Sequence, residues 1–262
     1  MEEVFKTGYK GNIKKSISEA ISGLGVFPGL IKKGDKVLLK PNFNTADPFL
    51  ASSDLEFLKS VAELVYEAGA REVVLGDSST IYQRTEKVME KMGVYSLEEL
   101  DKPVRVVNFD KGKWIKKEIP GGKYLKSVSV PEVLETVNKL ILLPCLKTHF
   151  IAGFTGSLKL SVGFIKPVER TFLHARNIQE KIAEMNTIIN PDLIIMDGRK
   201  CFITDGPAKG ELREPNLILA SRSRTEIDME GIRIIKSFPG NDLSEVSPRD
   251  FQQVKIAKNF NF

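Results

Sequence analysis

Polar side chains that could bind an anion or move a proton follow four apolar segments of the chain. They occupy residues 40–44, 76–80, 144–149 and 197–199. Ammonium groups neutralise an anion, amides and hydroxyls orient it, and an imidazole can transfer a proton. Because ligands of parallel α/β sheets bind beyond the carboxyl ends of the strands, the four segments together predict one site at that edge. Taken singly, each is also compatible with a surface lysine, a turn or a helix cap.

Residues 143–166 are the richest part of this pattern, because cations, hydroxyls and glycines alternate over a short distance. Glycines let backbone amides approach an anion, while hydroxyl and ammonium groups donate to it. A helix beginning near Thr155, Gly156 and Ser157 would add its free N–H groups. The segment is not a Walker A loop, because it has no Gly-Lys-Ser/Thr triplet, and ATP binding by that route is excluded.

The predicted site contains catalytic and ligand-binding residues. The candidate catalytic residues are His149, Asp77 and Asp197. The candidate ligand-binding or cofactor-binding residues are Lys40, Asn42, Ser78, Lys147, Thr148, Thr155, Gly156 and Lys159. We expect the lysines to hold the anion and His149, beside Lys147, to act as a neutral base or hydrogen-bond donor. Either aspartate could position a base or a metal.

Several roles stay open at this stage. Neither a metal nor a cofactor can be assigned from spacing, since the carboxylates would have to converge from distant loops. His174 is interpreted as structural, near Arg170 on a helix. Asp205 could serve a turn only, and Asp228 would need a partner if its helix buries it. The substrate, the reaction and the oligomeric state are not predicted.

The first elements form a strand–helix–strand unit. Lys36–Lys40 is an apolar run stopped by Pro41, which predicts a buried strand. Ser53 and Glu56 form a capping box that predicts the start of a helix, which ends at Gly69. Residues 72–76 predict the next strand, parallel to the first through a right-handed crossover.

The same alternation continues to the C-terminus. The further elements expected are strands at 139–143 and 193–196 and helices at 177–189, 225–236 and 249–258. Three short apolar runs separated by glycines predict a small antiparallel excursion near 102–130. The pattern predicts an α/β fold with a mostly parallel central sheet and flanking helices.

The chain has 262 residues, of which 42% are hydrophobic and 28% charged, with a formal charge of +5. These values exclude the disordered and collagenous classes. We expect one α/β domain over residues 1–262, the alternative being two lobes with the smaller near 77–135. No apolar run is long enough to span a membrane, and the N-terminus lacks the pattern of a secretory signal. We therefore expect a cytoplasmic protein without a membrane partner.

Residues 111–117 place Trp114 among four lysines, a pattern that a nucleic-acid platform could share. We interpret the run as a solvated strand or hairpin and do not expect a nucleic-acid partner, because acidic residues interleave with the basic ones. Cys145 and Cys201 are the only cysteines, too few for a disulfide framework or an iron–sulphur cluster on this chain alone.

In order and spacing, the chain resembles the uncharacterised family catalogued as domain of unknown function 362. The matching motifs are Lys40-Pro41-Asn42, Asp77-Ser78, Pro144 to His149, Thr155 to Lys159 with Gly163, His174, Asp197-Gly198, Asp205 to Gly210 and Ala220 to Asp228. The resemblance covers about residues 33–236 and supports the site map rather than a reaction. The chain departs from the family at Leu160, where an asparagine is usual, and it has no cysteine cluster like that of the family's iron–sulphur members.

The leading hypothesis is an enzyme that binds a small phosphate- or carboxylate-bearing ligand at the C-terminal edge of the sheet. The alternative is a non-catalytic accessory protein that handles a metal or iron–sulphur cofactor in a redox pathway. Only the resemblance to iron–sulphur members suggests the second.

Overall fold

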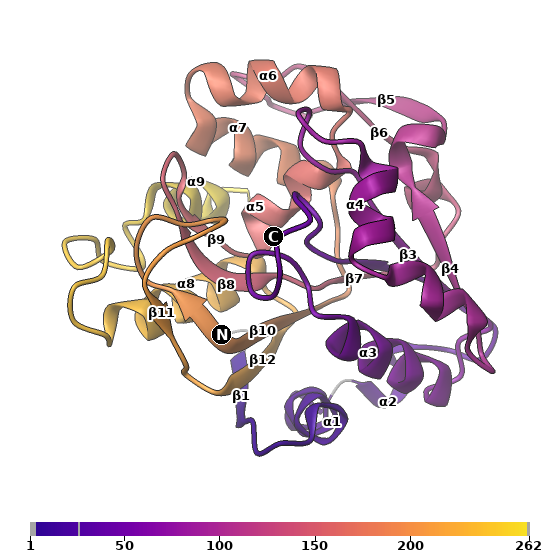
Figure 1. The fold of residues 1–262 in the computed structure, drawn as a ribbon. Helices are drawn as coiled ribbons and strands as arrows, with labels where there is room; N and C mark the ends of the chain where they lie inside the picture. Colours follow the sequence, from indigo (N-terminus) through magenta and orange to yellow (C-terminus); the bar gives the residue numbers. More distant parts are fainter. Residues whose placement is uncertain (1–3, 26, 261–262) are drawn as a thin grey trace.

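A ten-stranded sheet forms the centre of the computed structural model, which describes residues 4–25 and 27–260 (Figure 1). Its main path runs β1-β12-β10-β7-β2-β3-β4, with β8 and β11 paired to β10 and β9 paired to β8. The strands are β1 (Val4–Gly8), β2 (Lys36–Lys40), β3 (Glu72–Asp77), β4 (Val104–Asn108), β7 (Lys139–Leu142), β8 (Cys145–His149), β9 (Gly153–Thr155), β10 (Leu193–Phe202), β11 (Leu212–Arg213) and β12 (Leu217–Ser221).

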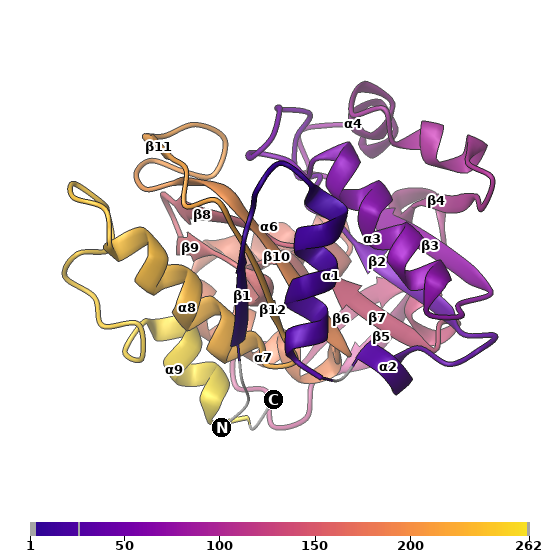
Figure 2. The ribbon, with the colours of Figure 1, turned by 90° about the horizontal axis from the view of Figure 1, so that it is seen from below.

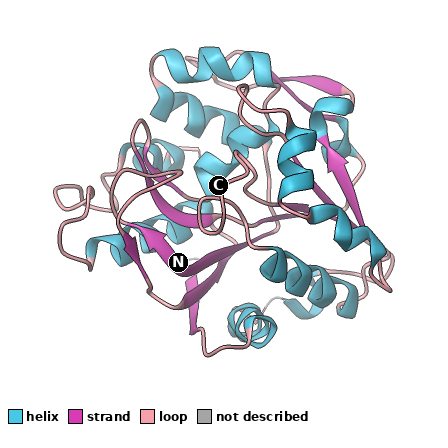
Figure 3. Ribbon diagram, viewed as in Figure 1, coloured by secondary structure: helices cyan, strands magenta, loops and turns pink. Residues whose placement is uncertain are grey.

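Helices cover both faces of the sheet (Figure 3), and they alternate with the strands from β1 to β4 along the first part of the chain. The α-helices are α1 (Ile13–Gly23), α2 (Phe27–Leu30), α3 (Leu55–Glu67), α4 (Thr85–Lys91), α5 (Ser157–Leu160), α6 (Pro167–Ala175), α7 (Ile178–Met185), α8 (Arg224–Lys236) and α9 (Gln252–Lys258). Short 3-10 helices are η1 (Val94–Glu99), η2 (Phe109–Lys111), η3 (Glu132–Glu135), η4 (Ser161–Phe164) and η5 (Asn186–Ile188).

The central strands are parallel, as predicted. β2 pairs in parallel with β3 and β7, β3 with β4, and β10 with β7 and β8. Antiparallel strands were not predicted at the far edge, where β12 pairs with β10 and with β1. The mostly parallel α/β architecture is thus confirmed.

The middle residues of β2, β3 and β7 are apolar because their side chains alternate between two cores. Val37 and Leu39 of β2 pack with α1 and α3 on one face. Leu38 packs on the other face, in a core that α5, α7, α8 and α9 complete. Figures 1 and 2 show the first helices on one side of the sheet and the later ones on the other.

The small antiparallel excursion is also confirmed. β5 (Trp114–Glu118) pairs with β6 (Ser127–Pro131) apart from the main sheet. The lysine-rich run around it is solvated, and Lys117 lies 2.8 Å from Glu135 in an ion pair. The division of the chain into one domain or two lobes stays a prediction.

Some element boundaries differ from the predicted ones. Asp54, not Ser53, caps α3, and the Ser53 hydroxyl instead accepts from the amide of Asn42. β10 extends to Phe202 because β8, β11 and β12 pair along it, so Asp197 lies inside a strand rather than after one. No helix among the described residues has the length and apolar character needed to cross a membrane.

Candidate functional site

A cavity of about 630 Å³ lies at the carboxyl ends of β2, β3 and β8. It is of the size that binds small molecules and cofactors. The predicted site residues that line it are Lys40, Asn42, Asp77, Ser78, Lys147, His149, Thr155 and Lys159. Three of the four strand-end segments, residues 40–44, 76–80 and 144–149, therefore meet at this cavity, together with Thr155 and Lys159, whereas the fourth segment does not. Thr148, Gly156 and Asp197 do not line the cavity.

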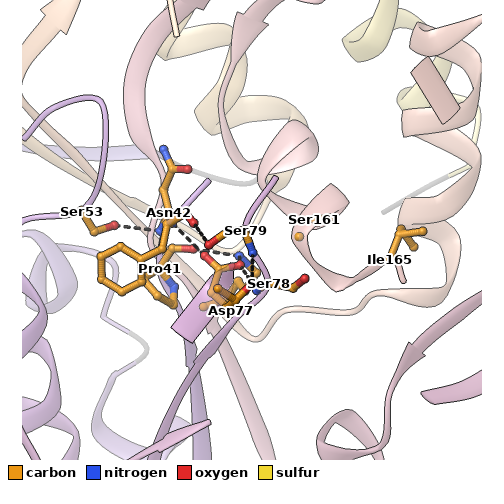
Figure 4. Close-up of polar contacts among 12 residues, drawn as sticks. Pro41, Asn42, Ser53, Asp77, Ser78, Ser79, Ser161 and Ile165 are labelled. Atoms are coloured by element: carbon orange, nitrogen blue, oxygen red, sulfur yellow. Dashed lines mark hydrogen bonds and ion pairs between the residues drawn. The ribbon is translucent and has the colours of Figure 1, made fainter. Parts of the chain in front are cut away.

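Lys40 and Asp77, at the ends of β2 and β3, form a buried ion pair with Nζ to Oδ1 at 2.6 Å. Asp77 also accepts from the amides of Phe43 and Ser78, and Lys40 Nζ donates to the carbonyl of Pro41. Figure 4 shows these contacts gathered around Asp77, with the Asn42 side chain extending away from them. Burial lowers the pKa of Lys40, against the opposing effect of Asp77. Asp77 thus holds the ends of β2 and β3 together.

Gly163 of η4 lies directly against this pair. A Cβ at that position would be 2.6 Å from Lys40 Nζ and 2.8 Å from Asp77 Oδ1. Only glycine lets the backbone of η4 approach so closely, which accounts for glycine at this position.

The other three cations of the cavity have no ion-pair partner in the part of the chain that the structure describes. Lys147 Nζ donates to the carbonyl of Ala51, and burial lowers the pKa of this lysine to about 8. Burial, followed by the charges of Arg170 and Lys147, lowers the pKa of Lys159 to about 8. Asp77 is the one carboxylate among the described residues that lines the cavity, so positive charge is in excess there.

Arg170 of α6 was not predicted as a site residue. Its buried guanidinium donates to the carbonyls of Ile165, Ser78 and Ser79, and also to Gly163. It therefore joins α6 to the loop after β3 while adding charge to the cavity. The sequence feature that could have pointed to Arg170 is its position four residues before His174 on a predicted helix, because that spacing puts both side chains on one face.

Two polar side chains of the cavity are buried without a hydrogen-bond partner among the residues that the structure describes. They are the Nδ2 group of Asn42 and the Oγ1 hydroxyl of Thr155, and each residue is 6% exposed. The Cys145 thiol, a weak acceptor, is near Asn42. Because unpaired buried polar groups cost about 1–3 kcal/mol, both are candidates for contact with a bound ligand.

His149 and His174 both line the cavity. Nδ1 of His149 accepts from the amides of Ile151 at 3.1 Å and Ala152 at 3.2 Å. Burial and the charge of Lys159 lower its pKa to about 3, so the ring is neutral at pH 7. Nδ1 of His174 lies 2.8 Å from the carbonyl oxygen of Arg170, and burial with the charge of Lys159 lowers the pKa of His174 as well.

Asp197 lies away from the cavity in a different charge cluster. Its carboxylate is 2.8 Å from the guanidinium of Arg199, which also pairs with Asp54 at 2.5 Å. The guanidinium packs on the rings of Tyr9 and Phe49. This arrangement fixes the loop before α3 to β10, a structural function that strand-end reasoning did not anticipate.

The contacts of Thr148, and of the helix start that follows Gly156, are also structural. The Thr148 hydroxyl accepts from the amide of Gly206, which holds the loop that brings Pro207 and Ala208 to the cavity. The amides at the start of α5 donate to Asp228, at 2.6 Å from Ser157 and 3.0 Å from Leu158. They are therefore not free for an anion, which corrects the expectation for this helix start.

A family model described as "Domain of unknown function (DUF362)" matches residues 37–233. This chain belongs to the DUF362 family. The match spans every residue that lines the cavity.

Two known proteins are similar to this DUF362 chain. The thylakoid-associated protein sll1697 of Synechocystis sp. is 29% identical over 226 residues, which cover 80% of this chain and 66% of that protein. The lactate racemase apoprotein of Thermoanaerobacterium thermosaccharolyticum superposes with a TM-score of 0.53 at 13% identity, covering 84% of this chain and 54% of that one. The second likeness is one of fold, and this chain spans about half of that protein's length.

Residues that could hold a metal ion are sparse. Among residues 4–25 and 27–260, no three His, Cys, Asp or Glu side chains cluster in a way that could hold one. Cys145 and Cys201 are both buried free thiols. Burial raises the pKa of Cys145 to about 11, which disfavours the thiolate that binds metals.

Proposed function

We propose that this DUF362 protein binds a small phosphate- or carboxylate-bearing ligand in the cavity and is an enzyme that acts on it. The observation that carries the proposal is the excess of positive charge in the cavity. Lys147, Lys159 and Arg170 have no ion-pair partner among the described residues, and Asp77 is already paired with Lys40. A bound anion would supply the missing negative charge.

Because these cations are buried, their unpaired charge costs free energy in the folded protein. Lys147 is 2% exposed and Arg170 5% exposed. Charged groups are costly to bury unless they are paired, so an anion would offset a cost already present in the fold. A hydrogen bond to a charged group contributes about 1.5–3 kcal/mol, and several of them could bind a small anion tightly. Asn42 Nδ2 and Thr155 Oγ1 would complete the set of donors.

The cavity is larger than a bare anion needs, and its mouth is apolar. Tyr82 and Phe150 line it while remaining 88% and 75% exposed. Ile81 and Ile151 lie beside them in the lining. The ligand proposed here therefore has an anionic group on the buried lysines and an apolar part between these side chains.

The fold likeness to lactate racemase makes a small carboxylate such as lactate a reasonable test compound. Inorganic phosphate and pyrophosphate are the test compounds for a phosphate-bearing ligand. Isothermal titration calorimetry of the purified protein with these three anions at pH 7 would measure their affinities. We expect at least one of them to bind.

Variants identify the residues responsible. Lys147→Ala and Lys159→Ala should each weaken the tightest anion by about tenfold or more, which corresponds to about 1.4 kcal/mol. Lys113→Ala is the matched control, because that side chain is 82% exposed directly before β5. Affinities that do not change in either cavity variant, or no binding by the unmodified protein, would contradict the proposal.

The accessory-protein hypothesis remains the alternative. Its test is the metal content of protein purified without oxygen. Stoichiometric iron or zinc would favour cofactor handling, whereas anion binding by metal-free protein would favour the enzyme.

A further inference from the structure

The two histidines of the cavity hold their protons on opposite ring nitrogens. Backbone amides can only donate, so His149 Nδ1, which accepts from Ile151 and Ala152, carries a lone pair. A backbone carbonyl can only accept, so His174 Nδ1, which contacts Arg170 O, carries a proton. The two contacts therefore fix different tautomers.

A neutral imidazole has one N–H group, so the remaining nitrogen of each ring is determined. Nε2 of His149 carries a hydrogen and can donate, whereas Nε2 of His174 carries a lone pair and can accept. The charge of Lys159 acts on both rings, the charge of Lys147 also acts on His149, and the charge of Arg170 also acts on His174. Without a bound anion these cations disfavour a second proton on either ring, and the charge of a bound anion would offset them.

We propose that Nε2 of His174 accepts a proton from the anion bound in the cavity, while Nε2–H of His149 donates a hydrogen bond to the same anion. The proposal rests on the proposed function, because it assumes that the anion occupies this cavity. It gives His174, which the sequence suggested was structural, the function of base. The sequence left two functions open for His149, a neutral base or a hydrogen-bond donor, and His149 is here the donor.

The step that follows is a proton transfer next to a carboxylate or carbonyl group. The bond between a ligand carbon and hydrogen breaks, and a new N–H bond forms at Nε2 of His174. The electron pair stays on the ligand and moves to an oxygen, which accepts the hydrogen bond from His149. Lys147 and Lys159 stabilise the charge on that oxygen. Return of the proton regenerates the neutral base, so the step needs no oxidant or reductant.

The test exploits the fact that the chain has only two histidines. Nitrogen-15 NMR of the labelled full-length protein at pH 7 distinguishes protonated from unprotonated ring nitrogens. His149→Gln and His174→Gln each remove one set of signals and so assign the rest. We expect the signals that disappear in His149→Gln to come from a ring protonated at Nε2. Those that disappear in His174→Gln should come from a ring protonated at Nδ1. The same tautomer in both rings, or a doubly protonated ring, would overturn the assignment.

Addition of inorganic phosphate separates this inference from the proposed function. We expect the signals of both Nε2 atoms to shift, with both tautomers retained. If calorimetry detects phosphate binding but neither Nε2 signal shifts, the contact of the histidines with the anion is refuted. If phosphate, pyrophosphate and lactate all fail to bind, the proposed function fails, whereas the tautomers are decided separately by the spectrum recorded without an anion.

Discussion

Lys147 combines a charge with nearly complete burial, and its ammonium donates to a backbone carbonyl rather than to a carboxylate. Its pKa of about 8 lies well below the ordinary lysine value of 10.5. The folded protein therefore binds the Lys147 proton less tightly than the unfolded chain does. Below pH 8 both states are protonated, and the fold carries the whole cost of burying the charge.

This shift predicts how stability depends on pH. Between pH 8 and 10.5 the unfolded chain binds more protons at this site than the fold does, so the contribution of Lys147 to stability rises with pH. Lys147→Met removes that contribution. We expect the difference in unfolding free energy between Lys147→Met and the unmodified protein to change by about 2 kcal/mol between pH 7 and 10, with Met relatively more favourable at pH 7. Urea denaturation at both pH values measures it.

The matched control is Lys113→Met, since Lys113 is largely exposed. Its difference from the unmodified protein should stay within about 0.5 kcal/mol at both pH values. A Lys147→Met difference that does not vary with pH would mean that Lys147 has an ordinary pKa.

The sequence predicted several lining residues because they directly follow apolar strands. Lys40, Asp77 and Lys147 are of this kind, although β8 turned out to continue through Lys147 as a strand. Arg170 could not be found this way, because it reaches the cavity from a helix and two of its backbone partners, Ser78 and Ser79, lie 92 and 91 residues away in sequence. Only the fold brings such groups together.

Helix α5 is a single turn, so its position depends on tertiary contacts rather than on its own hydrogen bonds. Asp228 of α8 accepts from its first amides, and the hydroxyl of Ser157 donates to the carbonyl of Arg224. Burial raises the pKa of Asp228 to about 6. Because Thr155 and Lys159 flank this contact, α8 indirectly positions two of the proposed ligand-binding groups.

Gly156→Ala should break this contact. A Cβ at Gly156 would lie 2.3 Å from Asp228 Oδ1 and 2.5 Å from the ring of Phe154, so the carboxylate would have to move. We expect a loss of about 2–4 kcal/mol in unfolding free energy, together with weaker anion binding. Thermal and urea denaturation measure the first effect and calorimetry the second.

Gly8→Ala provides the comparison, because a Cβ at Gly8 would meet nothing within 4 Å. That variant should stay within about 0.5 kcal/mol of the unmodified protein. Equal stabilities for the two variants would show that Asp228 does not fix α5.

Local patterns predicted the central elements better than their ends. The strand at Lys36–Lys40 and the helix that follows it were predicted from apolar periodicity and capping residues, since both signals are local. The length of β10 was not, because its extension past Met196 depends on pairing with β8, β11 and β12. That pairing moved Asp197 from the expected site to the cluster with Arg199.

The parallel arrangement of β2, β3 and β7 explains why the cavity lies where it does, since all their carboxyl ends point to one edge. The chain reaches β8 after Pro144, which has no amide to donate to a sheet. The sheet thus supplies Lys40 and Lys147, and α5 and α6 add Lys159 and Arg170 at the same edge.

The central claim is that this edge of the molecule holds an anion on unpaired cations. Crystals of the protein soaked in tungstate, a tetrahedral anion with strong anomalous scattering, test it most directly. We expect an anomalous peak inside the cavity, within hydrogen-bond distance of Lys147 Nζ and Lys159 Nζ. The peak should be absent from crystals of the Lys147→Ala, Lys159→Ala double variant. Peaks found only on the outer surface of the unmodified protein would contradict it.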